Sequence, residues 1–184
     1  MGRSACERHV TIQRFQTAVH TSSPSRFFSQ ISLDGYLDGY LGGEVDFAEG
    51  RRGAGGNVSL GVTLRPTDHL ELRANEGLRW LNVDIPPGGR GRLFTARVDR
   101  LRATYNFTSR VFLRLIGQYV STRLNPSLYT GEVNRRDAGL DFSALFACKL
   151  NWQTVLYAGY GDTRELSEQQ SLEPSGRQFF LKVS

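Results

Sequence analysis

A tandem repeat near the N-terminal third of the chain brings together side chains that can bind a ligand. Asp34, Tyr36, Asp38 and Tyr40 alternate with glycine and leucine. On an extended strand these four side chains share one face, so they are a candidate calcium or sugar site. Because calcium loops use closer spacings such as Asp-x-Asp, we favour the alternative that the repeat simply lines a polar face or a turn.

Arginines form a second candidate group, because they recur at polar positions of alternating segments. These are Arg65, Arg73, Arg79, Arg102 and Arg114. If they line the lumen of a pore, they would favour anions, as arginine rings do in channels. In the alternative, they form ion pairs with Glu71 and Asp141 that fill the interior, and the sequence leaves both possibilities open.

Residue types that carry catalysis or bind metals are sparse. The three histidines, His9, His20 and His69, are far apart, and Cys6 and Cys148 have no metal-binding spacing. No nucleophile, base and acid can be matched as a catalytic set. We therefore predict no enzymatic activity, no catalytic residue, no metal and no cofactor, which disfavours an outer-membrane hydrolase.

Two glycine-rich basic segments, residues 50–56 and 88–92, lack the Gly-Lys-Ser/Thr ending of a phosphate-binding loop. They are predicted to be ordinary loop material. The alternative is contact with lipopolysaccharide phosphates, which arginine binds well. The arginines concerned are Arg51, Arg52, Arg90 and Arg92.

The elements that position these side chains show alternation of apolar and polar residues. Val58, Leu60, Val62 and Leu64 alternate with small or polar residues, which predicts a strand with one apolar face. Similar alternation occurs in residues 27–41, 70–80, 111–122, 140–150 and 178–184. The pattern changes parity within residues 92–106, which predicts a β-bulge near Asp99 and Arg100.

Turn signals separate about nine such strands, the first beginning near His9. Short turns are predicted at residues 23–26, 66–69, 106–109 and 150–153, and longer polar connections at 42–56, 84–91, 124–137 and 164–176. Short turns on one side and long loops on the other are typical of outer-membrane barrels. We expect an all-β fold, an antiparallel up-and-down transmembrane β-barrel or a C-terminal segment of a larger one, with roughly 8–10 strands. Residues 9–184 would form this segment after a disordered or non-native start at residues 1–8.

Bulk composition agrees with this class. The chain has 184 residues, a net charge of +5 and a mean hydropathy of −0.36, and it lacks the roughly 20 consecutive apolar residues of a spanning helix. The arginines are scattered, so no nucleic-acid partner is expected. The odd strand number and the lack of a visible export signal lead us to expect that the barrel is incomplete.

Three segments carry a resemblance to a known family. They are residues 101–119 (LRATYNFTSRVFLRLIGQY), 149–157 (KLNWQTVLY) and 177–184 (RQFFLKVS). They resemble the C-terminal barrel of a family of outer-membrane proteins of unknown function, in which a carbohydrate-binding-like domain precedes the barrel. The ends of barrels of the TonB-dependent receptor type are generally similar. Such barrels usually end on an aromatic residue, whereas this chain ends on Ser184.

The resemblance implies no catalytic residue. It implies a non-enzymatic segment in the bacterial outer membrane that serves as a pore or as an anchor for an upstream, carbohydrate-binding domain. The expected partners are outer-membrane lipid and lipopolysaccharide, with a carbohydrate or another small solute as ligand. The alternative is a soluble all-β ligand-binding module of the lipocalin or sandwich type.

Overall fold

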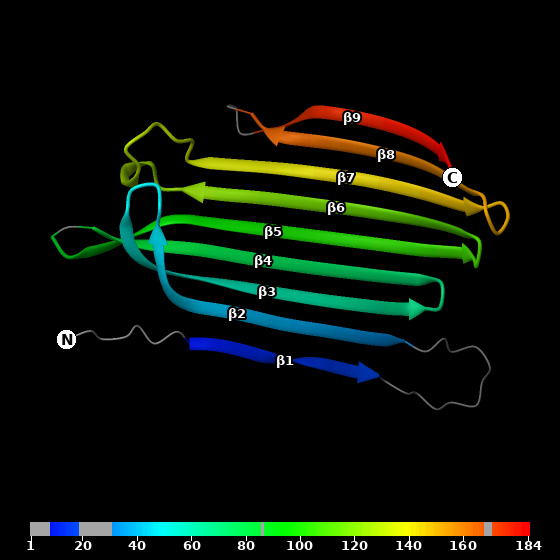
Figure 1. Ribbon diagram of the computed structural model, residues 1–184, viewed down its shortest axis with the longest axis horizontal. Coiled ribbons are helices and arrows are strands. Elements are labelled where there is room, and N and C mark those ends of the chain that lie inside the picture. The colour runs from blue at the N-terminus through cyan, green and yellow to red at the C-terminus, as the bar shows by residue number, and fades with distance from the viewer. Residues whose placement is uncertain (1–7, 19–30, 86, 168–170) are drawn as a thin grey trace.

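The computed structural model describes the backbone of residues 8–18 and the complete residues 31–85, 87–167 and 171–184. Within these ranges nine strands follow one another in a single antiparallel sheet, in the order β1 to β9 (Figure 1). This confirms the prediction of an all-β, up-and-down fold. The sheet is open, with β1 and β9 at its edges. No helix in these ranges is long and apolar enough to cross a membrane.

The elements have the following bounds. They are β1 (Arg8–Ala18), β2 (Ser32–Asp46), β3 (Arg51–Thr67), β4 (Leu70–Ile85), β5 (Gly89–Thr108), β6 (Val111–Leu124), the 3₁₀ turn η1 (Pro126–Leu128), β7 (Arg136–Lys149), β8 (Val155–Leu166) and β9 (Leu172–Val183).

The connections β3–β4, β5–β6 and β7–β8 lie at one end of the sheet, on the right in Figure 1, which we call the turn end. Each is closed by a polar side chain. Thr67 Oγ1 and Thr108 Oγ1 accept backbone N–H groups two and three residues ahead at 3.1–3.3 Å, and Asn151 Oδ1 does so at 2.8 and 2.9 Å. Three predicted short turns are thereby confirmed, and the fourth, at residues 23–26, lies outside the described residues.

The opposite end, which we call the loop end, differs from the prediction of four long connections. Strands continue through most of residues 42–56, 84–91 and 164–176, and only the β6–β7 connection, residues 125–135, is long. In β2 and β3, Gly42 lies opposite Gly55 and Gly43 opposite Ala54 in regular register. The prediction of long loops there was wrong because a glycine-rich strand can remain paired when its neighbour continues alongside it.

The predicted bulge near Asp99 and Arg100 is also misplaced. Both residues lie in unbroken register with β4 and β6. The register between β4 and β5 shifts instead at Leu93, since Leu81 pairs with Phe94 and Asn82 with Arg92. No extra residue lies between Val98 and Leu101, where the apolar residues of β5 change parity. They change parity there because the two faces exchange polarity toward the loop end.

Directly opposite residues of antiparallel strands lie on the same side, so the register assigns every side chain to one of two faces. The apolar face carries mainly Leu33, Leu37, Val58, Leu60, Val62, Leu72, Leu101, Leu115, Phe142, Phe146, Ala158, Phe179 and Leu181. The polar face carries mainly Asp34, Tyr36, Asp38, Asn57, Thr63, Arg65, Glu71, Arg73, Asn75, Arg100, Arg102, Arg114, Gln118 and Asp141. The predicted alternation is thus confirmed for both sets.

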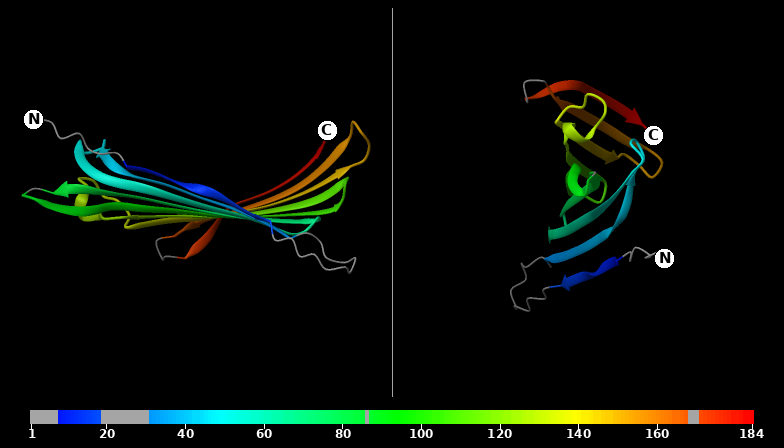
Figure 2. Two further views of the ribbon diagram at one scale, coloured as in Figure 1. Left: turned by 90° about the horizontal axis from the view of Figure 1, so that it is seen from below. Right: turned by 90° about the vertical axis from the view of Figure 1, so that its left-hand side faces the viewer.

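The sheet is strongly twisted, and the hairpin that joins β2 to β3 bends out of it at the loop end (Figure 2). It lies over the polar face, where Leu81, Val83 and Leu93 form the buried apolar cluster of the described residues. Leu128 and Tyr129, from the β6–β7 connection, pack against this cluster. The sheet therefore has a small core beneath the hairpin, on the side that elsewhere is polar.

Two polar contacts hold the hairpin to the β6–β7 connection. Arg51 pairs with the buried Asp46 at 2.8 Å and donates to the Leu128 carbonyl at 2.7 Å. Glu49 accepts hydrogen bonds from the backbone N–H and the hydroxyl of Thr130. These Thr130 hydrogen bonds lower the pKa of the Glu49 carboxyl. We call this pair of contacts the hairpin latch.

Arg51→Ala tests the hairpin latch. The substitution leaves the Asp46 carboxylate, whose side chain is 7% exposed, without its cation, and we expect the opening free energy of the hairpin to fall by about 1–3 kcal/mol. The measurement is amide hydrogen exchange of residues 44–52. Arg52→Ala is the matched control, because Arg52 is exposed on the other face, and its exchange should match the unchanged protein. Equal protection in both variants would contradict the latch.

Candidate functional site

The polar face contains a cleft of about 270 Å³ near the middle of β2 to β5. Its polar lining residues are Asp34, Tyr36, Thr63, Arg73, Asn75, Arg100 and Arg102. Four of the predicted site residues, Asp34, Tyr36, Arg73 and Arg102, therefore lie together. They come from three strands, so the sheet register and not the tandem repeat brings them together.

One side of the cleft is electrically balanced. Arg65 pairs with Asp34 at 3.1 Å and with Glu71 at 2.9 Å. Glu71 also lies 2.7 Å from Arg73 Nε and accepts a 3.1 Å hydrogen bond from Arg73 Nη2. The predicted ion-pair network thus exists around Glu71. Asp141 does not take part, since it forms no ion pair with the residues described.

The other side of the cleft has an excess of positive charge. Arg102 lies directly opposite Arg73 in the β4–β5 register, and Arg100 lies opposite Asn75. Like charges that face each other across a strand pair destabilise a sheet. Among the described residues neither Arg100 nor Arg102 has an acceptor. The buried Nε of Arg73 also lacks a well-aligned acceptor despite its short distance to Glu71.

Neutral hydrogen-bonding groups complete the cleft. Tyr36 donates from its hydroxyl to Asn75 Oδ1 at 3.3 Å. Its ring lies so close to Gly61 that a Cβ at this position would collide with it, so the glycine makes room for the Tyr36 ring in the cleft. The Asn75 amide and the Thr63 hydroxyl remain as further donors. Several guanidinium and neutral donors that converge on one cleft are suited to binding an anion, such as a carboxylate or a phosphate.

The remaining predicted site residues lie outside the cleft. Arg79 is nearer the loop end, where it pairs with Glu44 at 3.3 Å and lies over the Phe94 ring at 5.9 Å. Arg114 lies on the same face in β6, 5.4 Å from the centre of the Phe112 ring, and its Nε is buried without a partner. Asp38 and Tyr40 share the face of Asp34, but they do not line the cleft.

The sequence analysis missed Thr63 and two further polar lining residues, Asn75 and Arg100. The bulge predicted near Arg100 obscures the fact that this residue shares a face with Arg102. A regular β4–β5 register would have revealed both residues, because it pairs Asn75 with Arg100. No group of three or more His, Cys, Asp or Glu residues that could hold a metal occurs in the described ranges. Asp34 is instead held by Arg65.

No protein family, characterised protein or solved structure matches the chain. The resemblance of residues 101–119, 149–157 and 177–184 to outer-membrane barrels therefore stays a prediction. The two faces of the sheet and the cleft are the features from which a function can be inferred.

Phosphate should stabilise the protein through this cleft. A ligand at a concentration ten times its dissociation constant adds about 1.4 kcal/mol to the free energy of unfolding. The gain is measured by thermal unfolding in detergent, with phosphate compared with chloride at equal ionic strength. The Arg100→Gln/Arg102→Gln variant should lose the gain, and it should be no less stable than the unchanged protein without phosphate, because a repulsion is relieved.

Arg110→Gln/Lys149→Gln is the matched control for this measurement. It also removes two positive charges, but from exposed positions at the turn end. It should keep the full response to phosphate. An equal response in all three proteins would show that phosphate acts on the whole molecule and not in the cleft.

Proposed function

We propose that the sheet forms part of the wall of a β-barrel in the bacterial outer membrane, with the apolar face toward lipid and the polar face toward the lumen. The segment is non-enzymatic and serves as a transport pore for small solutes or as the anchor of a further domain. The alternative is a soluble ligand-binding module.

The observation that carries the proposal is a broad apolar band on one face that nothing in the described structure covers. Leu101 is 58% exposed, Phe179 80% and Leu181 72%. The band extends from β2 to β9 on the turn-end side of the apolar face. Large exposed apolar patches mark surfaces that contact lipid or another protein. An apolar band outside and a polar interior are the pattern of transmembrane barrels.

The loop-end boundary of this band runs obliquely across the strands. On β8 the band ends at Asp162, which lies directly opposite Phe142 of β7. The same row of opposite residues, followed across β6, β5 and β4, reaches Val62 of β3. On β3 the apolar residues continue beyond Val62 as far as Ala54. Strands of transmembrane barrels are tilted by about 35–45° to the membrane normal. A band of constant height must then cross such strands obliquely, as it does here.

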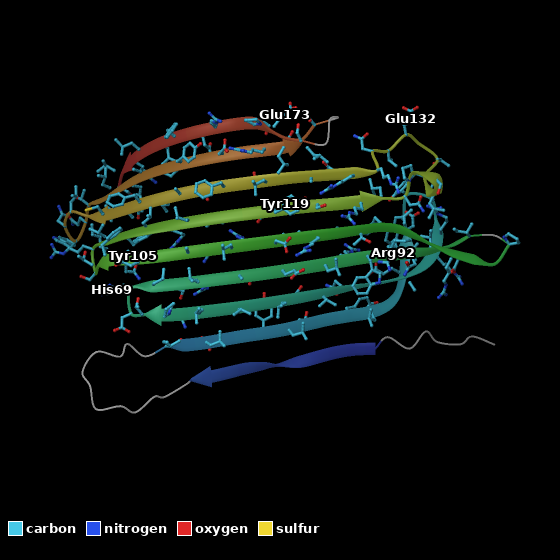
Figure 3. All side chains as sticks on the ribbon, turned by 180° about the vertical axis from the view of Figure 1, so that it is seen from behind. His69, Arg92, Tyr105, Tyr119, Glu132 and Glu173 are labelled. Atoms are coloured by element: carbon cyan, nitrogen blue, oxygen red, sulfur yellow. The ribbon has the colours of Figure 1, made fainter. Side chains whose placement is uncertain are left out.

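Aromatic side chains mark the edges of the band. At the turn end Tyr105 and Phe107 pack edge to face at 4.8 Å, and Trp152 is 87% exposed. Tyr105 and its neighbour His69 are seen at this end in Figure 3. Trp80 lies on the same face toward the loop end. Rings of this kind gather where hydrocarbon meets the polar headgroups.

The position of the β2–β3 hairpin supports the proposed orientation. The hairpin lies over the polar face and is fixed there by the contact of Arg51 with Leu128. Chain segments that fold over the polar face are common in outer-membrane barrels, whose lumen they narrow. A soluble barrel would instead turn the apolar face inward and place its charged face outside.

A sheet in a membrane requires that the backbone groups at both of its edges be hydrogen-bonded. Unpaired backbone groups of a strand edge are too costly in hydrocarbon. The outer edges of β1 and β9 must therefore be hydrogen-bonded in the membrane, either to each other or to further strands. The excess of arginine in the polar cleft gives the lumen a preference for anionic solutes.

Leu101→Arg tests the lipid-facing side of the sheet. A charged side chain on the lipid face of a barrel costs about 2–4 kcal/mol near the midplane, whereas lumen positions tolerate charge. We expect Leu101→Arg to reduce the fraction that folds into liposomes, measured by flotation and protease protection. Thr104→Arg, on the polar face of the same strand, should insert like the unchanged protein. A monodisperse protein without detergent would instead support the soluble ligand-binding module.

Planar-bilayer recording separates a pore from an anchor. In a pore, the unchanged protein should pass chloride in preference to potassium, and Arg100→Gln/Arg102→Gln should lower this preference, because two lumen cations are lost. Arg110→Gln/Lys149→Gln should change the preference less. Insertion without any conductance would assign the anchor role.

A further inference from the structure

Four arginines gather at the loop end of β5, β6 and β7, apart from the polar cleft. Arg92, Arg123, Arg135 and Arg136 line a hollow of about 540 Å³, together with uncharged residues that include Thr95 and Asn125. The register places Arg92, Arg123 and Arg136 on the apolar face, beyond its band. Figure 3 shows Arg92 at this end. We call these four residues the arginine clamp.

The arginine clamp has no carboxylate partner among the residues described. Arg123 and Arg136 lie directly opposite each other in the β6–β7 register. Arg136 donates to the Tyr119 hydroxyl at 3.2 Å, and Arg92 lies 5.8 Å from the centre of the Trp80 ring. These contacts orient the side chains without neutralising them. Facing like charges cost free energy, which a bound anion would recover.

The acids that the register places on the apolar face are already paired with other arginines. Arg97, also on the apolar face, pairs with Glu76 at 3.1 Å and with Asp99 at 2.9 Å. Asp162 is held by Arg164 at 2.9 Å and by Arg177 at 3.1 Å. The positive charge of the arginine clamp therefore remains available to a ligand from outside the chain.

The location of the clamp indicates the ligand. It continues the apolar face on the loop side of the band, where the headgroup layer begins in the proposed orientation. Trp80 and Tyr119, which hold Arg92 and Arg136, are residues typical of that layer. We propose that the arginine clamp binds the phosphate groups of a phosphorylated glycolipid whose acyl chains lie against the apolar band. This inference rests on the proposed function, because only a membrane-inserted sheet brings such lipid to the clamp.

The lipopolysaccharide contacts predicted from the sequence were Arg51, Arg52, Arg90 and Arg92, and the clamp shares only one of these four residues. Arg51 is used by Asp46 in the hairpin latch, and Arg90 pairs with Asp84 at 2.8 Å. Arg52 lies near the hairpin and does not line the hollow. Of the predicted set only Arg92 belongs to the clamp. Arg123 and Arg136 join it through the register of β6 and β7, and Arg135 directly precedes β7.

The experiment titrates the full chain in detergent with bisphosphorylated lipid A and, separately, with the same lipid after its phosphates are removed. The affinity of the unchanged protein for the phosphorylated lipid should be at least about tenfold higher, because one charge-assisted hydrogen bond contributes about that much. Arg123→Gln/Arg136→Gln should lose this preference. Arg123→Lys/Arg136→Lys, which keeps the charge, should retain part of it. Arg110→Gln/Lys149→Gln removes the same charge at the turn end and should keep the preference within about twofold.

Each of three results would overturn the proposal. The first is an equal affinity of the unchanged protein for both lipids. The second is an unchanged preference for the phosphorylated lipid in Arg123→Gln/Arg136→Gln, when this variant has a native circular dichroism spectrum. The third is that inorganic phosphate binds the clamp as tightly as the lipid does. Flotation with liposomes keeps the proposed function separate. Failure to insert contradicts the barrel itself, whereas insertion without phosphate preference contradicts only the clamp.

Discussion

The constraint on which the structure depends is the register of its antiparallel strand pairs. Because side chains alternate along each strand, one register fixes the face of every residue, and a slip by one residue would exchange the two faces. From β5 to β8 the pairs continue regularly over most of each strand. The apolar band, the polar cleft and the arginine clamp are all consequences of that register. None of them is formed by a local segment of the chain.

The two ends of the sheet use this constraint differently. Toward the turn end, the apolar face carries no charged side chain until the chain reverses, whereas the polar face also carries Phe112, Leu145 and Phe180. Toward the loop end the polarity exchanges, so that Val83 is buried on the otherwise polar face while Arg123 lies on the otherwise apolar face. A sheet that leaves a membrane and enters water no longer needs an apolar outer face. In the proposed orientation, the hairpin over Val83 and the arginines around Arg123 would both lie where the sheet leaves the membrane.

The sequence was sufficient to predict the strands and the separation of faces, because alternation is a local property. It was also sufficient for the turns closed by Thr67 and Thr108, whose side chains act on their own neighbours. It was not sufficient for the loop end, where glycine-rich residues of β2 and β3 stay paired only because each has the other as a partner. The cleft was predicted in part. Arg73 and Arg102 could be recognised as polar-face residues, but their direct opposition depends on the β4–β5 register.

The distribution of arginine on the two faces is the clearest physical link between fold and function. Where the chain gains only stability, its arginines are neutralised, as Arg65 is by Asp34 and Glu71. Where Arg102 faces Arg73, and where Arg123 faces Arg136, the sheet tolerates a repulsion that a single substitution could remove. Local features that oppose stability tend to occur at functional sites. The two unbalanced pairs lie on opposite faces of the sheet, so in the proposed barrel an anion in the lumen and an anionic lipid outside would each neutralise one of them.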